Sequence, residues 1–441
     1  MSKQGYKTFK GGIHPPYRKE LASGKPIQEA PAPAEVIIPL QQNIGAPNNP
    51  LVSAGDRVTV GQKIAETEAF VSAPVHSSVA GTVKAIEEIT NFAGAGVKAA
   101  VITADPTQPP FASQLLKPAG ELSAEEIRQV AREAGLTGMG GAAFPTHVKL
   151  TPPKDKPVDT VILNGCECEP FLTCDHRLML ESPVDLIEGL KLLMRAVGAE
   201  RGIVGIEANK MDAVEKVEAA AAEESNISVE ILDVKYPEGS EKQLIFAVTG
   251  RGVPPGKLPS EVGCLVQNVG TAIALFEAAS TGKPLYERIV TVTGPAIREP
   301  SNFLVKIGTP ISVLIEASGG IEGTAAKLIM GGPMTGWAQK DTSASVVKGT
   351  SGLVLLPEEL VDVRDERECV RCAKCIDACP MFLMPNYIVE AAKKGDWEKA
   401  ELWGALDCFE CGVCSFTCPA YIPHVEYVRN AKAEIGALKR R

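Results

Sequence analysis

Eight of the twelve cysteines fall in two runs of identical spacing. The first run is CVRCAKCIDACP (369–380) and the second is CFECGVCSFTCP (408–419), so both follow the pattern C-x2-C-x2-C-x3-C-P. Three cysteines at this spacing wrap around one [4Fe–4S] cluster, and the fourth cysteine of each run ligates the other cluster. The pattern predicts two neighbouring clusters, which carry one electron at a time.

The crossover of the fourth cysteines fixes the expected ligands. They are Cys369, Cys372, Cys375 and Cys418 for cluster 1, and Cys408, Cys411, Cys414 and Cys379 for cluster 2. The alternative is a pair of structural zinc sites, which would use C-x2-C pairs and would not need the trailing x3-C-P. Between the runs, residues 386–406 predict two short helices that pack the repeat together.

A glycine-rich stretch upstream, GLTGMGGAAFPTHVKL (135–150), has the composition of an anion-binding loop. Gly138, Gly140 and Gly141 can adopt backbone angles that let main-chain N–H groups approach an anion. If this anion is a phosphate group, the Lys149 side chain would reach it as well. Taken alone, the stretch fits a tight turn as well as it fits a phosphate loop.

Polar residues follow directly after the apolar segment VDTVILN (158–164). Asn164, Glu167 and Glu169 stand at the carboxyl end of this predicted buried strand. Open α/β sheets bind their ligands at that edge. The alternative for the two carboxylates is a solvated loop.

The elements that must position these motifs alternate between helix and strand. A helix begins at Ser123 with a capping box to Glu126 and ends at Gly135. Another begins at residues 182–183 and stops at Gly198. Strands are expected at 158–164, 202–209 and 227–236. Repeated βα units predict a mostly parallel sheet with helices on both faces.

Short apolar strands with glycine turns flank this region. Residues 36–103 resemble a lipoyl/biotinyl-type barrel-sandwich domain, in which Ala69 stands where a modified Lys would be, so no swinging arm is expected. Residues 289–350 resemble the SLBB type of β-grasp domain, for which packing or docking is the expected role. Residues 25–35 are interpreted as a linker or extended arm and residues 104–120 as a second linker.

Composition excludes several classes of protein. The net charge of −9 over 441 residues argues against a nucleic-acid-binding protein. No signal peptide is expected, because residues 1–20 contain no apolar core segment. No transmembrane segment is expected, because the most apolar long stretch (264–280) is too short and too polar. The cysteine pattern indicates metal binding in a reducing cytoplasm rather than disulfides. Outside the two runs, Cys166, Cys168, Cys174 and Cys264 are expected to be buried free thiols, with a redox role left open for the first two.

The order of four motifs carries a family resemblance. GMGGAAFPTHVK, NGCECEP, YPEGSEKQL (236–244) and QNVGTAIAL (267–275) follow the order seen in the NADH- and FMN-binding flavoprotein subunit of respiratory complex I, which residues 120–280 resemble. With the N-terminal GGIHPPYRK, the two β-rich units and the double cysteine motif, the whole chain resembles the C subunits of Rnf complexes. These complexes are membrane-bound ferredoxin:NAD+ oxidoreductases that pump Na+ or H+.

The resemblance implies cofactors and site residues. FMN would exchange a hydride with the substrate NAD(H) and pass single electrons to or from two [4Fe–4S] clusters. The implied FMN site consists of Gly138, Gly140, Gly141, Lys149, Asn164, Glu167, Asn268 and Thr271. Phe144 would stack on the nicotinamide nucleotide, helped by Glu169, Glu238 and Glu241. No side chain is required as a catalytic acid or base.

The sequence departs from the complex I pattern at three positions. Met139 replaces an Arg, Ala143 replaces a Gly, and Cys166 replaces an Asp. Met139 and Cys166 motivate one alternative, an electron-carrier or scaffold subunit whose nucleotide site is inactive. A second alternative is a cobalamin reductase of the propanediol-utilisation type. In that family the flavin module leads the chain, whereas here residues 36–103 precede it.

The combined expectation is a multidomain α/β protein. Its parts are an N-terminal arm (1–35), a barrel-sandwich domain (36–105), a Rossmann-like FMN/NADH domain (120–284), an SLBB β-grasp domain (285–355) and an α-helical two-cluster ferredoxin-like domain (360–441). The expected partners are the other subunits of a membrane complex, with ferredoxin acting indirectly and no nucleic acid involved. The expected location is peripheral, on the cytoplasmic face of the cell membrane.

Overall fold

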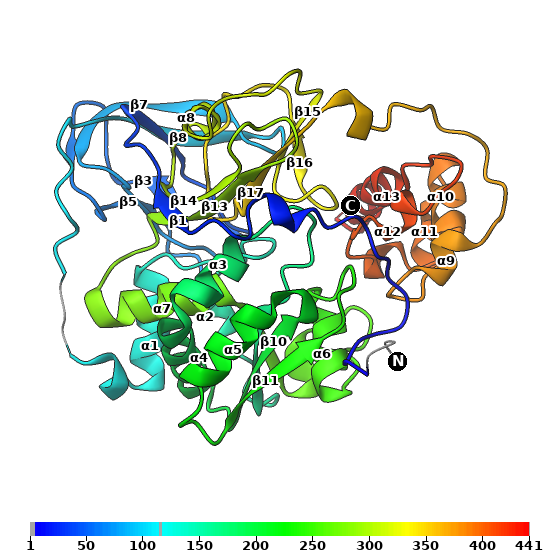
Figure 1. Cartoon of the computed structure of the whole chain (residues 1–441), viewed down its shortest axis with the longest axis horizontal. Coiled ribbons are helices and arrows are strands. Elements are labelled where there is room, and N and C mark those ends of the chain that lie inside the picture. The colour runs from blue at the N-terminus through cyan, green and yellow to red at the C-terminus, as the bar shows by residue number, and fades with distance from the viewer. Residues whose placement is uncertain (1–4, 114–116, 441) are drawn as a thin grey trace.

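The computed structural model describes residues 5–113 and 117–440 (Figure 1). Parts of three sequence predictions therefore lie outside the described residues: positions 1–4 of the arm, 114–116 of the second linker and 441 of the last domain. In Figure 1 the two β-rich units lie above the α/β unit, and the helices of the cluster unit lie to one side. The multidomain α/β fold class is confirmed.

The α/β unit is built on a four-stranded parallel sheet. Its strands are β9 (Thr160–Gly165), β10 (Arg201–Glu207), β11 (Ile227–Leu232) and β12 (Cys264–Asn268), in the spatial order β11-β10-β9-β12. The chain moves outward from β9 to β11 and then returns to place β12 on the other side of β9. The direction of winding therefore reverses between β9 and β12, and ligands bind at such switch points in open α/β sheets.

Helices cover both faces of this sheet, as the alternation of side chains along β9 requires. Val161 and Leu163 pack in one apolar core with residues of α4, whereas Ile162 packs in another with residues of α6. The helices are α1 (Ala124–Glu133), α2 (Thr146–Lys149), α3 (Cys174–Glu181), α4 (Pro183–Val197), α5 (Met211–Ala220), α6 (Glu241–Thr249) and α7 (Val269–Thr281).

The predicted helix signals are confirmed at α1 and α4. Ser123 and Glu126 form the reciprocal capping box that begins α1. Gly198 ends α4 with a φ of 73°, a left-handed conformation that glycine adopts without steric cost.

The barrel-sandwich unit consists of two antiparallel sheets. One contains β2 (Glu35–Pro39), β4 (Arg57–Val58), β7 (Gly81–Thr90) and β8 (Gly96–Ala104), and the other contains β3 (Asn49–Pro50), β5 (Lys63–Glu66) and β6 (Val75–His76). The loop after β5 packs on the α/β unit, because the His147 ring contacts the Phe70 ring edge-on and lies 2.9 Å from the Phe70 carbonyl oxygen.

The β-grasp unit is a six-stranded sheet that includes part of the N-terminal arm. It contains β13 (Glu287–Thr293), β14 (Ser301–Lys306), β15 (Lys327–Met330), β16 (Trp337–Gln339), β17 (Gly352–Leu356) and helix α8 (Ile311–Ala317). Residues 25–35 are more than a linker, because β1 (Ile27–Glu29) pairs with β14 at the edge of the sheet. The sequence did not show this, since the strand is too short to carry a pattern.

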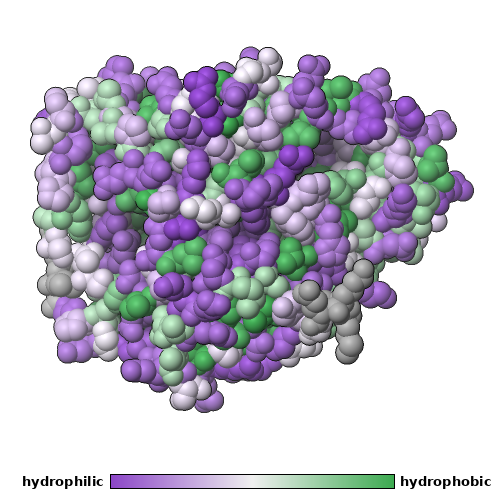
Figure 2. Space-filling model, viewed as in Figure 1, coloured by the Kyte–Doolittle hydropathy of each residue, from purple (hydrophilic) through white to green (hydrophobic). Residues whose placement is uncertain are grey.

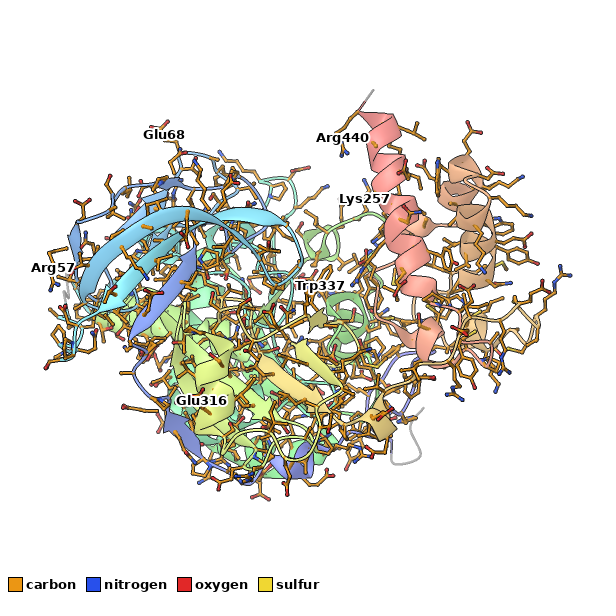
Figure 3. All side chains as sticks on the ribbon, turned by 90° about the horizontal axis from the view of Figure 1, so that it is seen from above. Arg57, Glu68, Lys257, Glu316, Trp337 and Arg440 are labelled. Atoms are coloured by element: carbon orange, nitrogen blue, oxygen red, sulfur yellow. The ribbon has the colours of Figure 1, made fainter. Side chains whose placement is uncertain are left out.

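The cluster unit is helical and internally repeated. Its helices are α9 (Lys374–Asp377), α10 (Pro385–Lys393), α11 (Trp397–Leu402), α12 (Val413–Phe416) and α13 (His424–Lys439). The two helices predicted within 386–406 correspond to α10 and α11, and Ile388 and Ala400 from them share an apolar core with Ile435 of α13. Figure 3 labels Trp337 between the β-grasp sheet and α13, and its ring lies 4.7 Å from the Arg429 guanidinium carbon.

No helix within residues 5–113 and 117–440 has the length and apolarity needed to span a membrane. On the face shown in Figure 2, apolar residues are scattered among hydrophilic ones.

Candidate cofactor sites

The eight cysteines of the two runs surround two separate cavities in the cluster unit. Cavity 1 is lined by Cys369, Cys372, Cys375 and Cys418. Cavity 2 is lined by Cys379, Cys408, Cys411 and Cys414. Each cavity thus combines three cysteines of one run with the fourth cysteine of the other, which is the grouping expected from the spacing.

The loops that carry these thiols repeat each other in backbone conformation. Arg371 and Ala373 in the first run have positive φ angles of 54° and 61°, and Glu410 and Gly412 in the second run have 63° and 81°. A left-handed conformation turns the chain sharply, so that successive cysteines face one centre. Three of these four residues are not glycine, so a positive φ strains their backbone. The fold of the loop imposes this strain.

The two cavities differ in exposure. Cys369 and Cys372 are exposed, whereas Cys411 and Cys414 of cavity 2 are buried. Burial raises the pKa of the Cys411 thiol to about 12 and raises that of Cys414 as well. These thiols would hold their protons at neutral pH unless a cationic centre replaced them. Four soft sulfur ligands around one cavity suit an iron–sulfur cluster, so the residues fit the expected group.

Cavity 2 lies against the α/β unit. The Tyr236 hydroxyl donates a hydrogen bond of 2.8 Å to the Cys411 carbonyl, and the Gln243 amide donates one of 3.1 Å to the Pro380 carbonyl. Cys168 and Tyr236 share an apolar cluster with Cys411 and Val413. The carboxyl end of the β9 strand and the second cysteine run are therefore in direct contact.

The glycine loop lies beside the amino end of α7. The Gly138 N–H donates to the Phe144 carbonyl at 2.9 Å, which closes the loop, and the Met139 N–H donates to the Thr271 hydroxyl at 3.0 Å. Gly140 and Gly141 are exposed. A Cβ atom on Gly140 would lie 2.6 Å from Asn268 Nδ2, so only glycine permits this close approach.

Asn164 and Asn268 are register partners at the carboxyl ends of β9 and β12. Asn268 Oδ1 accepts from the Gly270 and Thr271 N–H groups and so caps α7, while its Nδ2 donates to Asp175 at 2.7 Å. Asn164 Nδ2 donates to the Gly239 carbonyl at 2.7 Å, in the segment 236–244. The two asparagines thus join three of the predicted motifs at the switch point of the sheet.

Glu167 and Glu169 lie in a tightly held loop and not in a solvated one. The Asp175 N–H donates to Glu167 Oε1 at 2.7 Å. Glu169 Oε2 accepts from the Met334 N–H at 3.0 Å, and its Oε1 accepts from the Thr335 hydroxyl. Burial raises the pKa of Glu169. The β-grasp unit therefore holds one of the carboxylates that the sequence assigned to the nucleotide.

Lys149 and Glu241 form an ion pair of 2.8 Å, and Lys149 also donates to the Val266 carbonyl at 2.7 Å. Glu238 is fully buried and accepts a hydrogen bond of 2.8 Å from the Thr8 hydroxyl. Burial is the main cause that raises the pKa of Glu238 to about 8. Phe144 is half-buried at the end of the glycine loop.

Four residues that were not predicted from the sequence hold these loops through hydrogen bonds. Buried Lys19 donates to the carbonyls of Glu167, Glu169 and Leu172 at 2.7, 3.0 and 2.5 Å. Buried Lys210 donates to the Cys166 carbonyl at 2.5 Å. Asp175 and Arg288 complete the set. Only Lys19 lies within one of the sequence motifs, the N-terminal GGIHPPYRK, and no spacing pattern links it to the other three residues.

The polar groups at the switch point fit FMN. The loop places two exposed glycines, Gly140 and Gly141, beside the amino end of a 13-residue helix, and such an end favours a phosphate group. The Asn268 Nδ2 group carries two hydrogens, one of which goes to Asp175. Because Gly140 has no side chain, the backbone of the glycine loop lies close to this amide.

Comparison with known proteins gives four family matches along the chain. They are the RnfC barrel sandwich hybrid domain at residues 7–107, the Nuo51 FMN-binding domain at 131–277, the SLBB domain at 289–338 and the 4Fe-4S dicluster domain at 361–419.

Two similar proteins match over nearly their whole length, and both are the C subunits of their complexes. The one from the Na(+)-translocating ferredoxin:NAD(+) oxidoreductase complex of Acetobacterium woodii is 46% identical over 437 residues, which cover 98% of this chain and 98% of that protein. The one from the proton-translocating complex of Clostridium ljungdahlii is 43% identical, covering 97% of this chain and 94% of that protein.

A chain of an NAD+-reducing [NiFe]-hydrogenase in the air-oxidized state shares the fold. The TM-score is 0.50 at 21% sequence identity, and the match covers 71% of this chain and 62% of the hydrogenase chain.

Proposed function

Because the chain belongs to the family of C subunits of ion-translocating ferredoxin:NAD+ oxidoreductase complexes, we propose that it is the NAD(H)-reacting subunit of such a complex. The chain contains an FMN-binding domain and a [4Fe–4S] dicluster domain. Bound FMN converts between hydride transfer and single-electron transfer, and the clusters carry the single electrons. The full-length match favours this family over the cobalamin reductases.

One contact carries the proposal. Tyr236, in the segment that also carries Glu238 and Glu241, donates its hydroxyl hydrogen to the carbonyl of a predicted cluster ligand, Cys411. The predicted flavin site and one thiol cavity are therefore adjoining parts of one packed structure, which an electron path requires.

The proposed cluster ligands are the two cysteine sets of cavities 1 and 2. Cavity 2 adjoins the α/β unit, and the cluster it holds would exchange electrons with the flavin. Cavity 1 includes the exposed Cys369 and Cys372, and Val370 between them is 68% exposed. The cluster in cavity 1 would exchange electrons with another protein of the complex.

The proposed FMN site lies at the switch point between β9 and β12. Gly138, Gly140, Gly141 and Thr271 would hold the phosphate side with α7, and Asn164, Glu167 and Asn268 would line the carboxyl ends of the strands. Lys149 would reach the ligand on release of its pairing with Glu241. Phe144, Glu169, Glu238 and Glu241 would bind or order the nicotinamide nucleotide. None of these side chains needs to transfer a proton.

The proposed location is the cytoplasmic face of the cell membrane, where other subunits of the complex hold this one peripherally. Ferredoxin would deliver electrons elsewhere in the complex. The exposed rim of cavity 1 offers a point of contact for another electron-carrying protein of the complex.

An anaerobic spectrum of the reconstituted chain tests the proposal. FMN and iron are quantified, and the spectrum is taken before and after the addition of NADH. We expect bleaching of flavin and cluster absorption together. Iron for two clusters without flavin, or without bleaching, would instead indicate a scaffold protein with an inactive nucleotide site.

A further inference from the structure

Arg288 belongs to the β-grasp sheet, but its guanidinium group reaches the glycine loop of the α/β unit. It lies in β13 and is 6% exposed. Its Nη1 donates to the Met139 carbonyl at 3.3 Å and to the Lys348 carbonyl at 2.5 Å, and its Nε donates to the Ile289 carbonyl at 3.1 Å. These three acceptors are main-chain oxygens, so the buried guanidinium group holds backbone, and the side chains of Cys174 and Asp175 lie close to it.

Met139 is held on both sides. Its N–H donates to the Thr271 hydroxyl at 3.0 Å, and its carbonyl accepts from Arg288. The bond from Met139 to Gly140 is trans. In a trans peptide the C=O and the following N–H point in opposite directions. Because Arg288 draws the Met139 carbonyl inward, the Gly140 N–H points away from the core, and Gly140 is exposed.

Gly140 lies next to other hydrogen-bond donors. A Cβ on Gly140 would be 2.6 Å from Asn268 Nδ2, which has a second hydrogen besides the one given to Asp175. The amino end of α7 begins at Val269, and its dipole favours an anion. Gly140, a side-chain amide and a helix end thus lie together at this place.

We propose that Arg288 is a positioning residue for this point: by holding the Met139 carbonyl, it aims the Gly140 N–H at the phosphate group of FMN. The inference rests on the proposed function, because it takes FMN as the anion. Arg288 itself lies behind the loop and does not touch the ligand. The β-grasp unit therefore takes part in building the flavin site and is not only a docking module.

The test compares two flavins that differ only in the phosphate group. Flavin-free full chain with its clusters reconstituted is titrated with FMN and with riboflavin, and binding is followed by quenching of flavin fluorescence. In Arg288→Met we expect FMN affinity to fall about tenfold or more, as for loss of a hydrogen bond to a charged group, with riboflavin affinity unchanged. Arg288→Lys keeps the charge without the fork of donors and should show a smaller FMN-selective loss.

Two further variants keep the result interpretable. Arg298→Gln changes an exposed arginine of the same unit and should bind both flavins as the wild type does. Thr271→Val releases the other side of Met139 and should also weaken FMN more than riboflavin. Iron content and cluster absorption report whether each variant is folded.

Two outcomes would overturn the inference. They are unchanged FMN affinity in Arg288→Met, and an equal loss for FMN and riboflavin in a variant with full iron content. A wild-type protein that binds neither flavin would reject the proposed flavin site itself, and the inference with it.

Discussion

The hydroxyl oxygen of Tyr236 lies 2.8 Å from the carbonyl oxygen of Cys411, and this bond links the α/β unit to the cluster unit. It is buried, and it joins residues 175 positions apart in sequence. A bond here fixes the rim of cavity 2 relative to the end of β9, because both residues also belong to one apolar cluster.

Tyr236→Phe removes this bond and keeps the ring. The Cys411 carbonyl then loses its donor in a buried place, which costs about 1–3 kcal/mol. We expect slower electron transfer from flavin to clusters after NADH is mixed in, while flavin reduction itself keeps its rate. Stopped-flow absorbance at flavin and cluster wavelengths measures both. Tyr427→Phe is the matched control, because that exposed hydroxyl bonds Glu366 instead; an equal effect of both variants would refute the role of Tyr236.

The crossover of ligands predicts different losses from two similar substitutions. Cys418→Ser should remove the cluster of cavity 1, and Cys379→Ser should remove the cluster of cavity 2. Each variant should retain about half of the iron, since each set holds one cluster. With NADH, the Cys418→Ser variant should still show bleaching of its remaining cluster, and the Cys379→Ser variant should not. Electron paramagnetic resonance of the reduced variants assigns the surviving cluster, and the reverse pattern would disprove the proposed order.

Glu238 predicts a pH dependence of stability. Burial raises its pKa from 4.5 to about 8, so in the folded protein it keeps its proton at pH values where the unfolded chain has lost it. The folded state binds more protons between these two values, and the stability contribution is lost as the pH rises from about 4.5 to 8. In Glu238→Gln, the unfolding midpoint should decrease less as the pH rises over this range. Glu218→Gln, at an exposed position on α5, is the control and should leave the fall unchanged.

Lys19→Met should loosen the loop that carries both candidate carboxylates. The substitution leaves the buried carbonyls of Glu167, Glu169 and Leu172 without their shared donor, at a cost of roughly 3 kcal/mol. We expect a lower unfolding midpoint and weaker retention of FMN on gel filtration. Lys25→Met in the same arm serves as the control. Unchanged flavin retention in Lys19→Met would show that the loop holds its shape without this lysine.

The sequence predicted those parts of the molecule that are encoded locally. Cysteine spacing predicted the composition of both cavities, because each loop is set by a few adjacent residues. The capping box at Ser123 and the glycine at 198 marked helix ends for the same reason. The parallel sheet followed from repeated βα units.

The supports of the site could not be predicted, because they come from far along the chain. Lys19 lies 148 residues from Glu167, and Arg288 lies 149 residues from Met139. A single buried lysine or arginine has no periodicity and no characteristic spacing. Asn268 was assigned to the ligand, but the structure shows that its side chain also caps α7 and bonds Asp175. These further contacts of the Asn268 side chain can be recognised only when neighbouring strands are placed in register.

The N-terminal arm meets three other units as it crosses the molecule. Thr8 bonds Glu238, Gly12 bonds Ala378, Lys19 bonds the loop after β9, and β1 completes the β-grasp sheet. A growing chain makes this arm before the segments it contacts, and Ala378 is added more than 300 residues later. Closing such long loops is slow. The contact between Gly12 and Ala378 can therefore form only after the first cysteine run has been synthesised, whereas the contacts of Thr8 and Lys19 need only the α/β unit.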